Sequence, residues 1–191
     1  SKFDHTLLHP LYQIRVGWLH AEVAALVSNH EDARRIAEAE DVRFVHLPVT
    51  HETKPFQEAA LLDLVEETCA ELVVLARYMQ VLSDDLTRKL SGRAINIHHS
   101  FLPAFKGANP YKQAYQRGVK LIGATSHYVT ADLDEGPIIE QDVARISHAD
   151  TAADLVAIGR DTESRVLAGA VKLHLERRVL LCGSRTVIFR K

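Results

Sequence analysis

The sequence predicts an α/β fold: an open, mostly parallel, doubly wound (Rossmann-like) sheet with helices on both faces. Over the first hundred residues, short apolar segments alternate with longer segments that carry apolar residues at helical spacing. One short segment, Leu72–Ala76, is apolar throughout, as expected of a strand buried on both faces of a parallel sheet. In such sheets ligands bind at the carboxyl ends of the strands, so these ends are where we expect a site.

The strand prediction rests on short apolar or alternating segments bounded by turn residues. The expected strands are Glu22–Ser28, Val42–Pro48, Leu72–Ala76, Ala94–Ile97, Val119–Thr130 and Pro137–Ile146. We expect the last of these to pair antiparallel with the one before it. The tail beyond residue 178 predicts a two-stranded hairpin centred on Gly183–Ser184.

The helix prediction rests on apolar periodicity and on capping residues. Phe3–Leu19 has helical spacing, although Pro10 is expected to kink or interrupt a helix there. The remaining expected helices are Glu31–Glu40, Phe56–Cys69, one that starts after Ser83, Asn109–Gly118, and a long one from Asp150 as its cap to Arg178.

Length and composition bound the class of protein. A chain of 191 residues, with 47% hydrophobic and 25% charged residues, is most simply one soluble globular domain, 1–191. A net charge of -2 offers no electrostatic basis for binding nucleic acid or an anionic membrane, and no apolar run approaches a membrane span. Cys69 and Cys182 lack CxxC spacing, which favours buried or incidental thiols in a reducing cytoplasm.

Two of the expected strands end in side chains that can move protons or donate hydrogen bonds. The first cluster is Asn96, His98, His99 and Ser100, and the second is Thr125, His127, Asp132 and Asp134. If the two strands lie side by side, one imidazole, one amide and one carboxylate converge at a common end of the sheet. That convergence predicts an acid–base site, and the alternative is a loop of satisfied polar residues.

The chemistry of this cluster follows from residue type and spacing. Asn96 and His98 are two residues apart, so on an extended strand their side chains face the same way. An amide donor beside an imidazole can stabilise an oxyanion while the imidazole handles a proton. Asp134 precedes the turn-forming run Glu135–Pro137, which can hold its carboxylate at a set angle and so orient His98.

A metal site is the competing interpretation of the same residues. His98, His99, His127 and Asp134 offer ligand types, but the chain has no HExxH motif and no Cys/His pattern at metal spacing. On an extended backbone the adjacent side chains of His98 and His99 would point to opposite faces. We therefore expect no metal.

Two weaker signals lie in loops. The run Arg77–Gln80 is either a strand-to-helix turn, with Tyr78 and Met79 packing as core, or a backbone edge for a flat heterocycle. Lys106 and Gly107 could contact phosphate, but a lysine and a glycine are common in any loop.

The two central runs, NIHHSFLPAFKGANPY and KLIGATSHYVTADLDEGPIIEQDV, closely resemble the deformylase branch of the 10-formyltetrahydrofolate-dependent formyltransferases. The similarity extends over nearly the whole chain. It implies the formyltransferase-type fold and hydrolysis of 10-formyltetrahydrofolate to formate and tetrahydrofolate, which supplies formate for purine synthesis and balances the folate pool. It implies a small-molecule folate substrate and no further cofactor. We also expect a homo-oligomer, because the long helix Thr151–Arg178 and the C-terminal hairpin offer surfaces for self-association.

The resemblance also implies roles for particular residues. The catalytic trio of the superfamily matches Asn96, His98 and Asp134. His99, Ser100, Thr125 and His127 are possible supporting residues. The folate-binding positions match Arg77, Tyr78, Met79, Gln80, Val81, Leu82, Val129, Thr130, Ala131 and Asp132.

Two alternatives stay open beside hydrolysis. A glycinamide ribonucleotide formyltransferase needs a cradle for the substrate phosphate, usually a glycine-rich turn, whereas the matching run SKFDHTLL contains no glycine. A non-catalytic folate-binding module would not need an acid–base trio. The deformylase branch typically has an N-terminal ACT-type regulatory domain and a strand before this point of the sheet, and we expect neither within the sequence given.

Overall fold

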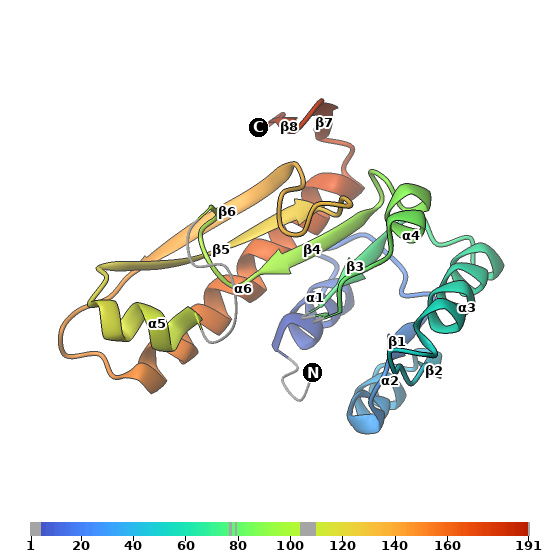
Figure 1. Ribbon diagram of the computed structural model, residues 1–191, viewed down its shortest axis with the longest axis horizontal. Coiled ribbons are helices and arrows are strands. Elements are labelled where there is room, and N and C mark those ends of the chain that lie inside the picture. Colours follow the sequence, from blue (N-terminus) through green and yellow to red (C-terminus); the bar gives the residue numbers. More distant parts are fainter. Residues whose placement is uncertain (1–4, 77, 79, 104–109, 191) are drawn as a thin grey trace.

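The computed structural model describes residues 5–76, 78, 80–103 and 110–190 (Figure 1). Its elements lie where the periodicity placed them, with bounds that differ by a few residues. They are α1 (His5–Arg15), β1 (Leu26–Ser28), the short 3-10 helix η1 (Glu31–Ala33), α2 (Arg34–Ala39), β2 (Phe44–His46), α3 (Lys54–Glu67), β3 (Val73–Leu75), α4 (Asp84–Lys89), β4 (Ala94–His98), α5 (Pro110–Arg117), β5 (Leu121–Tyr128), β6 (Ile138–Arg145), α6 (Ala152–Leu175), β7 (Val179–Cys182) and β8 (Arg185–Ile188).

The strands confirm the α/β class and show where the sheet changes direction. β1 pairs with β2 and β3 with β4, and both pairs are parallel, as expected for the first hundred residues. β5 lies antiparallel to β4, and β6 antiparallel to β5, so the central sheet, in the order β3-β4-β5-β6, is mixed. The antiparallel pairing of β5 with β6 and the C-terminal hairpin β7–β8 were both predicted.

Helices cover both faces of the central sheet, and alternate side chains of β4 pack against these two layers. Ile95 and Ile97 face α6 and pack in a cluster with Leu167. Ala94 faces the other way and packs in a second cluster with leucines of α3 and of the α4 region, including Leu90. In Figure 1, α6 runs along β4, β5 and β6, while α3 and α4 lie at the β3 side.

The N-cap of the long helix α6 lies one residue later than predicted. Thr151, rather than Asp150, is the N-cap: its hydroxyl accepts from the Asp154 backbone N–H at 3.2 Å, and the Asp154 carboxylate accepts from the Thr151 N–H at 2.8 Å. Asp150 instead accepts from the Ser147 N–H at 2.6 Å, in the preceding turn. The helix also ends at Leu175 rather than Arg178, since Arg177 has a φ of 55°.

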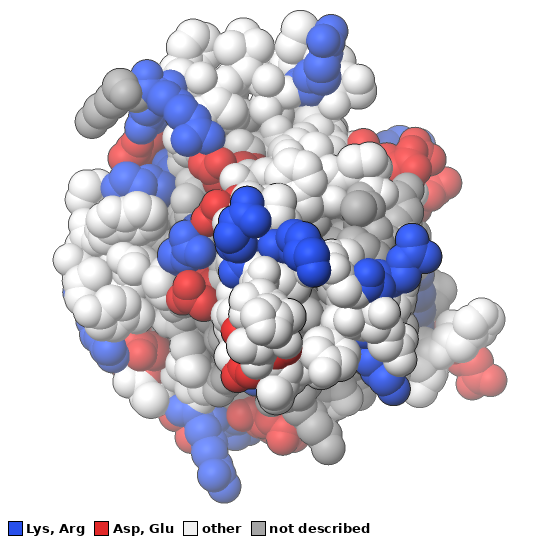
Figure 2. Space-filling view, turned by 90° about the vertical axis from the view of Figure 1, so that its left-hand side faces the viewer, with Lys and Arg blue, Asp and Glu red and all other residues white. Residues whose placement is uncertain are grey.

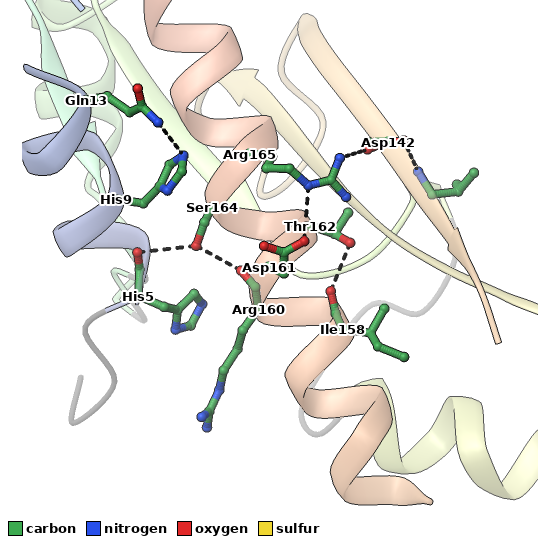
Figure 3. A network of polar contacts seen from close by, with 11 residues as sticks. His5, His9, Gln13, Asp142, Ile158, Arg160, Asp161, Thr162, Ser164 and Arg165 are labelled. Atoms are coloured by element: carbon green, nitrogen blue, oxygen red, sulfur yellow. Dashed lines mark hydrogen bonds and ion pairs between the residues drawn. The ribbon is translucent and has the colours of Figure 1, made fainter. Parts of the chain in front are cut away.

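The first helix continues through Pro10, where a kink or an interruption was expected, so the interruption does not occur. Pro10 lacks the N–H that would bond to the Thr6 carbonyl, yet α1 runs unbroken from His5 to Arg15 and packs along α6. The Ser164 hydroxyl lies 3.2 Å from the His5 carbonyl oxygen and ties the start of α1 to α6 (Figure 3). Tertiary packing along α6 thus outweighs one lost backbone hydrogen bond.

The prediction that Leu72–Ala76 is buried on both faces is wrong within the described structure. In β3, Leu75 is buried, but Val74 on the opposite face is 36% exposed. An all-apolar run indicates that a strand can be buried on both faces, whereas burial requires a second layer of side chains over each face.

On the face around α5, the residues that the structure describes form no extended area of one charge. Figure 2 shows Lys and Arg side chains interspersed there with Asp and Glu. Within the described ranges, no helix is both long and apolar enough to cross a membrane. Cys69 and Cys182 are free and exposed, so of the two interpretations, buried or incidental thiols, the first is excluded.

Candidate active site

Strand pairing brings the two predicted polar clusters together. In the β4–β5 pair, Asn96 lies opposite His127, and His98 lies opposite Thr125. A register shift between Ser126 and His127 in the β5–β6 ladder marks a bulge beside the cluster. The pairing skips Ile139, so the extra residue lies on β6, opposite the step from Ser126 to His127.

Asp134 reaches this cluster from the connection between β5 and β6. Its Oδ2 lies 3.2 Å from His98 Nδ1, and its Oδ1 lies 3.6 Å from His127 Nε2. The side chains of Asp134, His98 and His127 are 14%, 6% and 3% exposed. One carboxylate therefore contacts two largely buried imidazoles.

The backbone around Asp134 is held in an uncommon conformation. Asp134 has a φ of 57°, in the left-handed region that non-glycine residues rarely adopt. Two residues later, a Cβ on Gly136 would overlap the carbonyl oxygen of Tyr128, so only glycine allows the connection to lie this close to the end of β5. The Tyr128 N–H donates to the Pro137 carbonyl at 2.9 Å and closes the loop.

The hydrogen-bond partners of the two imidazoles favour the same tautomer, with the proton on Nδ1. His127 Nδ1 lies 2.9 Å from the Tyr128 carbonyl and must donate to it, which leaves Nε2 facing the Asn96 amide nitrogen at 3.4 Å. His98 Nδ1 faces Asp134, which favours a proton on that nitrogen. Among the described residues the buried His98 Nε2 has no hydrogen-bond partner, so it is the nitrogen available to a ligand.

The two imidazoles also set the charge of Asp134. Contacts with His127 and His98 lower the pKa of the Asp134 carboxyl well below its usual range, against the opposing effect of partial burial. The contact with His98 is the shorter, so we assign the main orienting role to that pair. The carboxylate is therefore ionised throughout the physiological pH range.

Comparison with known proteins identifies the family. A family model described as formyl transferase matches residues 4–171. The formyltetrahydrofolate deformylases of Corynebacterium sp. (strain P-1) and Bacillus subtilis (strain 168) are 55% and 51% identical over 100% and 99% of this chain, and that of Escherichia coli (strain K12) is 45% identical over 98%. The chain belongs to the formyl transferase family.

Solved structures of formyl transferase relatives agree with the fold. A formyltetrahydrofolate deformylase from Burkholderia mallei superposes with a TM-score of 0.96 at 55% identity, covering 100% of this chain and 68% of its own. A glycinamide ribonucleotide transformylase from Symbiobacterium toebii superposes with a TM-score of 0.91 at 32% identity, covering 98% and 90%. The chain spans about two thirds of the length of the curated relatives, at 66%, 63% and 67% for the three named above.

The predicted supporting residue Thr125 braces the loop that follows β4 in this formyl transferase. Its fully buried hydroxyl donates to the Ser100 carbonyl at 2.9 Å and accepts from the Leu102 N–H at 3.0 Å. Gln141 of β6 donates to the same hydroxyl at 2.9 Å and lies 3.3 Å from the Leu102 carbonyl. Sequence analysis missed Gln141, because nothing local distinguishes it from other polar residues of an alternating strand.

His99 lies where the extended-strand argument did not place it. The His98 and His99 ring centroids are 4.9 Å apart, at an interplanar angle of 84°. β4 ends at His98, so the alternation of an extended strand no longer applies at the next residue. In the described part of the chain, no group of three or more His, Cys, Asp or Glu side chains has the arrangement of a metal site.

The two predicted folate-binding segments meet in the formyl transferase fold. Leu82, Tyr78 and Val129 all pack in or against the cluster on the α3–α4 side of the sheet. Gln80, Val81, Ala131 and Asp132 are exposed, and the Thr130 hydroxyl donates to the Asp132 carbonyl at 3.0 Å. Arg77, Met79, Lys106 and Gly107 lie outside the described residues.

A separate surface cavity of about 370 Å³ lies between α1 and α6. His5, His9 and Arg160 are among its lining residues, and Figure 3 shows this region. None of the predicted site residues that the structure describes lines it. We place the candidate site at the cluster of Asn96, His98 and Asp134, because His127 contacts both Asn96 and Asp134, and Asp134 also contacts His98.

Proposed function

We propose that this chain hydrolyses 10-formyltetrahydrofolate to formate and tetrahydrofolate, with Asn96, His98 and Asp134 as its catalytic residues. The observation that carries the proposal is the Asp134 carboxylate in contact with His98 Nδ1, with the Asn96 amide on the same strand face. The names of the relatives that are 45–55% identical support the same reaction. The proposal includes no cofactor besides the folate substrate.

The first step is attack of water on the formyl carbon. Asp134 holds the His98 ring through Nδ1, so that Nε2 faces the reacting atoms and can take a proton from the attacking water. The new C–O bond leaves negative charge on the formyl oxygen. The Asn96 amide and protonated His98 donate to that oxyanion, which is the main source of rate enhancement in acyl transfer.

The second step breaks the bond between the formyl carbon and N10 of the folate. The tetrahedral intermediate collapses to formic acid, which ionises, and the proton taken from the water passes through His98 to N10. A neutral amine leaves far more readily than an amide anion, so proton delivery and bond cleavage are coupled. The products balance as formate, a proton and tetrahydrofolate.

Folate binding is assigned to the two segments that share one apolar cluster. Tyr78, Leu82 and Val129 provide apolar surface beside exposed backbone of the segments 78–82 and 129–133. A flat pterin ring suits such a surface, because apolar side chains contact its faces while backbone groups pair with its edge.

Water rather than a phosphorylated amine is the proposed acceptor. The run SKFDHTLL offers no glycine-rich cradle for a phosphate. Deformylase structures from Burkholderia mallei and Pseudomonas putida are 55% and 53% identical, whereas the glycinamide ribonucleotide enzymes are 32% or less. Transfer to glycinamide ribonucleotide remains the second candidate, because those enzymes share the fold.

The decisive measurement is formate release from 10-formyltetrahydrofolate without any added acceptor. The chain is expected to release formate at a rate that glycinamide ribonucleotide does not increase. Asp134→Asn, which tolerates the left-handed backbone, is expected to lower kcat by about 10² to 10⁴, the usual worth of acid–base catalysis, while tetrahydrofolate affinity changes little.

Three results would contradict the proposal in different ways. Formate release that requires glycinamide ribonucleotide would assign the transferase reaction instead. Tetrahydrofolate binding without turnover would assign a folate-binding module. Unchanged turnover in Asp134→Asn would remove Asp134 from the catalytic residues.

Assembly and location complete the proposal. We infer a homo-oligomer in the cytoplasm. Exposed apolar side chains on the C-terminal hairpin and just after it support self-association, namely Leu180, Leu181, Val187 and Phe189. Free exposed thiols at Cys69 and Cys182 suit a reducing compartment.

A further inference from the structure

A carboxylate that the proposed mechanism does not use is buried in the middle of α6. Glu163 is 1% exposed. Its Oε1 accepts a short hydrogen bond from the Tyr111 hydroxyl of α5, and its Oε2 lies 2.9 Å from His5 Nε2 at the start of α1. A buried carboxylate is costly unless such partners compensate its lost hydration, so these contacts have to form together.

Tyr111 is held in place from two independent sides. Its hydroxyl is fixed by Glu163, and its ring lies against the α6 backbone at Gly159, where a Cβ would overlap the ring. Tyr111 is 8% exposed. Glu163 and Gly159, both in α6, therefore fix the position of the Tyr111 ring.

The Tyr111 ring also contacts His99, the residue that follows His98 of the candidate active site. The His99 ring stands edge-on to Tyr111, with centroids 6.5 Å apart and an interplanar angle of 89°. The His99 ring in turn stands edge-on to His98, with centroids 4.9 Å apart. Edge-to-face contacts are the favoured arrangement of aromatic rings, so each ring restrains the next.

We propose that Tyr111 and Glu163 are positioning residues for His98 and that they act through the ring of His99. Asp134 contacts His98 at one atom, Nδ1, which leaves the imidazole able to pivot about that contact. The His99 ring limits this pivot and so sets the direction in which Nε2 points. A misplacement of 1 Å in a reacting group can cost about 10²-fold in rate, so such a restraint is of catalytic size.

The inference rests on the proposed function in taking His98 as the reacting group. Tyr111→Phe keeps the ring and removes the hydroxyl, and Glu163→Gln keeps the shape and removes the charge. Each is expected to lower kcat for formate release about tenfold with KM within about twofold, because binding groups are untouched while the reacting nitrogen is misdirected. The double variant is expected to lose no more than the worse single variant.

A double-mutant cycle identifies the route of the effect. In a His99→Ala background, Tyr111→Phe is expected to cause no further loss of kcat. Tyr115→Phe on the same helix and Asp161→Asn on α6 are the matched controls, since Tyr115 is exposed and Asp161 forms an ion pair with Arg165 away from the trio. Both controls should keep the kcat of the parent chain, and thermal unfolding checks that every variant is folded.

An activity-independent readout separates this inference from the proposed function. The NMR signals of the His98 imidazole are expected to shift in Tyr111→Phe and in Glu163→Gln but not in the two controls.

An active chain in which Tyr111→Phe and Glu163→Gln leave both kcat and these signals unchanged would overturn the positioning role. A full tenfold loss from Tyr111→Phe in the His99→Ala background would overturn the route through His99. A chain that releases no formate would refute the proposed function, and the NMR comparison would still decide the positioning.

Discussion

At the scale of single residues, Asp134 combines an uncommon backbone conformation with an unusual electrostatic setting. Its φ of 57° places the carboxylate where it contacts both His98 and His127. Aspartate and asparagine tolerate this left-handed conformation better than most residues do. This position therefore needs a short polar side chain, which tolerates the backbone conformation, and a negative charge, which interacts with the two imidazoles.

The lowered pKa of Asp134 predicts how stability depends on pH. Because the folded-state pKa lies below the unfolded value of about 3.9, the carboxylate adds stability above about pH 4 and loses it as the pH falls further. Between pH 6 and 8, the melting temperature of the wild type is expected to lie a few degrees above that of Asp134→Asn. Each kcal/mol of stability corresponds to about 2–4 °C in melting temperature. Calorimetry should show this difference in melting temperature becoming smaller below about pH 4. A difference that stays constant down to pH 3 would contradict the ionised state assigned to Asp134.

At the scale of elements, the connection between β5 and β6 positions the carboxylate. It leaves β5 after Tyr128 and returns through Gly136, which lies against the Tyr128 carbonyl, before β6 pairs with β5 through a register shift at Ile139. The neighbouring loop after β4 is braced by Thr125 and Gln141. Two loops that carry the site are thus each fixed by contacts with β5.

Gly136→Ala tests the fit of this connection. The added Cβ would meet backbone, which cannot move aside as a flexible side chain can, so we expect a loss of about 2 kcal/mol or more and at least a tenfold fall in kcat. Gly169→Ala in α6 is the matched control, because its Cβ would lie 3.7 Å from Glu140 Cγ, an ordinary contact. In urea unfolding, the free energy of unfolding of this control should be unchanged or higher by up to about 1 kcal/mol. Equal effects at the two glycines would contradict this account.

At the scale of the whole molecule, β4 lies between two apolar clusters. Leu167 belongs to the cluster under α6, and Leu90 belongs to the cluster on the α3–α4 side. Both leucines are almost fully buried. Since consecutive residues of β4 enter opposite clusters, loss of either cluster disturbs the strand that carries Asn96 and His98.

This arrangement predicts one cooperative unfolding unit, as expected for a single domain. Leu167→Ala and Leu90→Ala are each expected to cost about 2–5 kcal/mol, and the two costs should add to within about 0.5 kcal/mol. Both variants should shift one common transition, observed by circular dichroism and by Trp18 fluorescence. Two transitions, each moved by only one variant, would indicate separate folding units.

The sequence alone determined the order of helices and strands, the β5–β6 and C-terminal hairpins, and the shared face of Asn96 and His98. Each of these depends on periodicity over a few neighbouring residues, which a sequence displays directly. The assignment of Asp134 to the trio rested partly on resemblance, since its loop could follow several paths from the sequence alone. Tertiary structure decided that Asp134 reaches His98, that Gln141 braces the loop, that His99 lies beside His98, that α1 runs through Pro10 and that Val74 stays exposed. These outcomes depend on strand register and on which layers cover each face, which many distant residues set together.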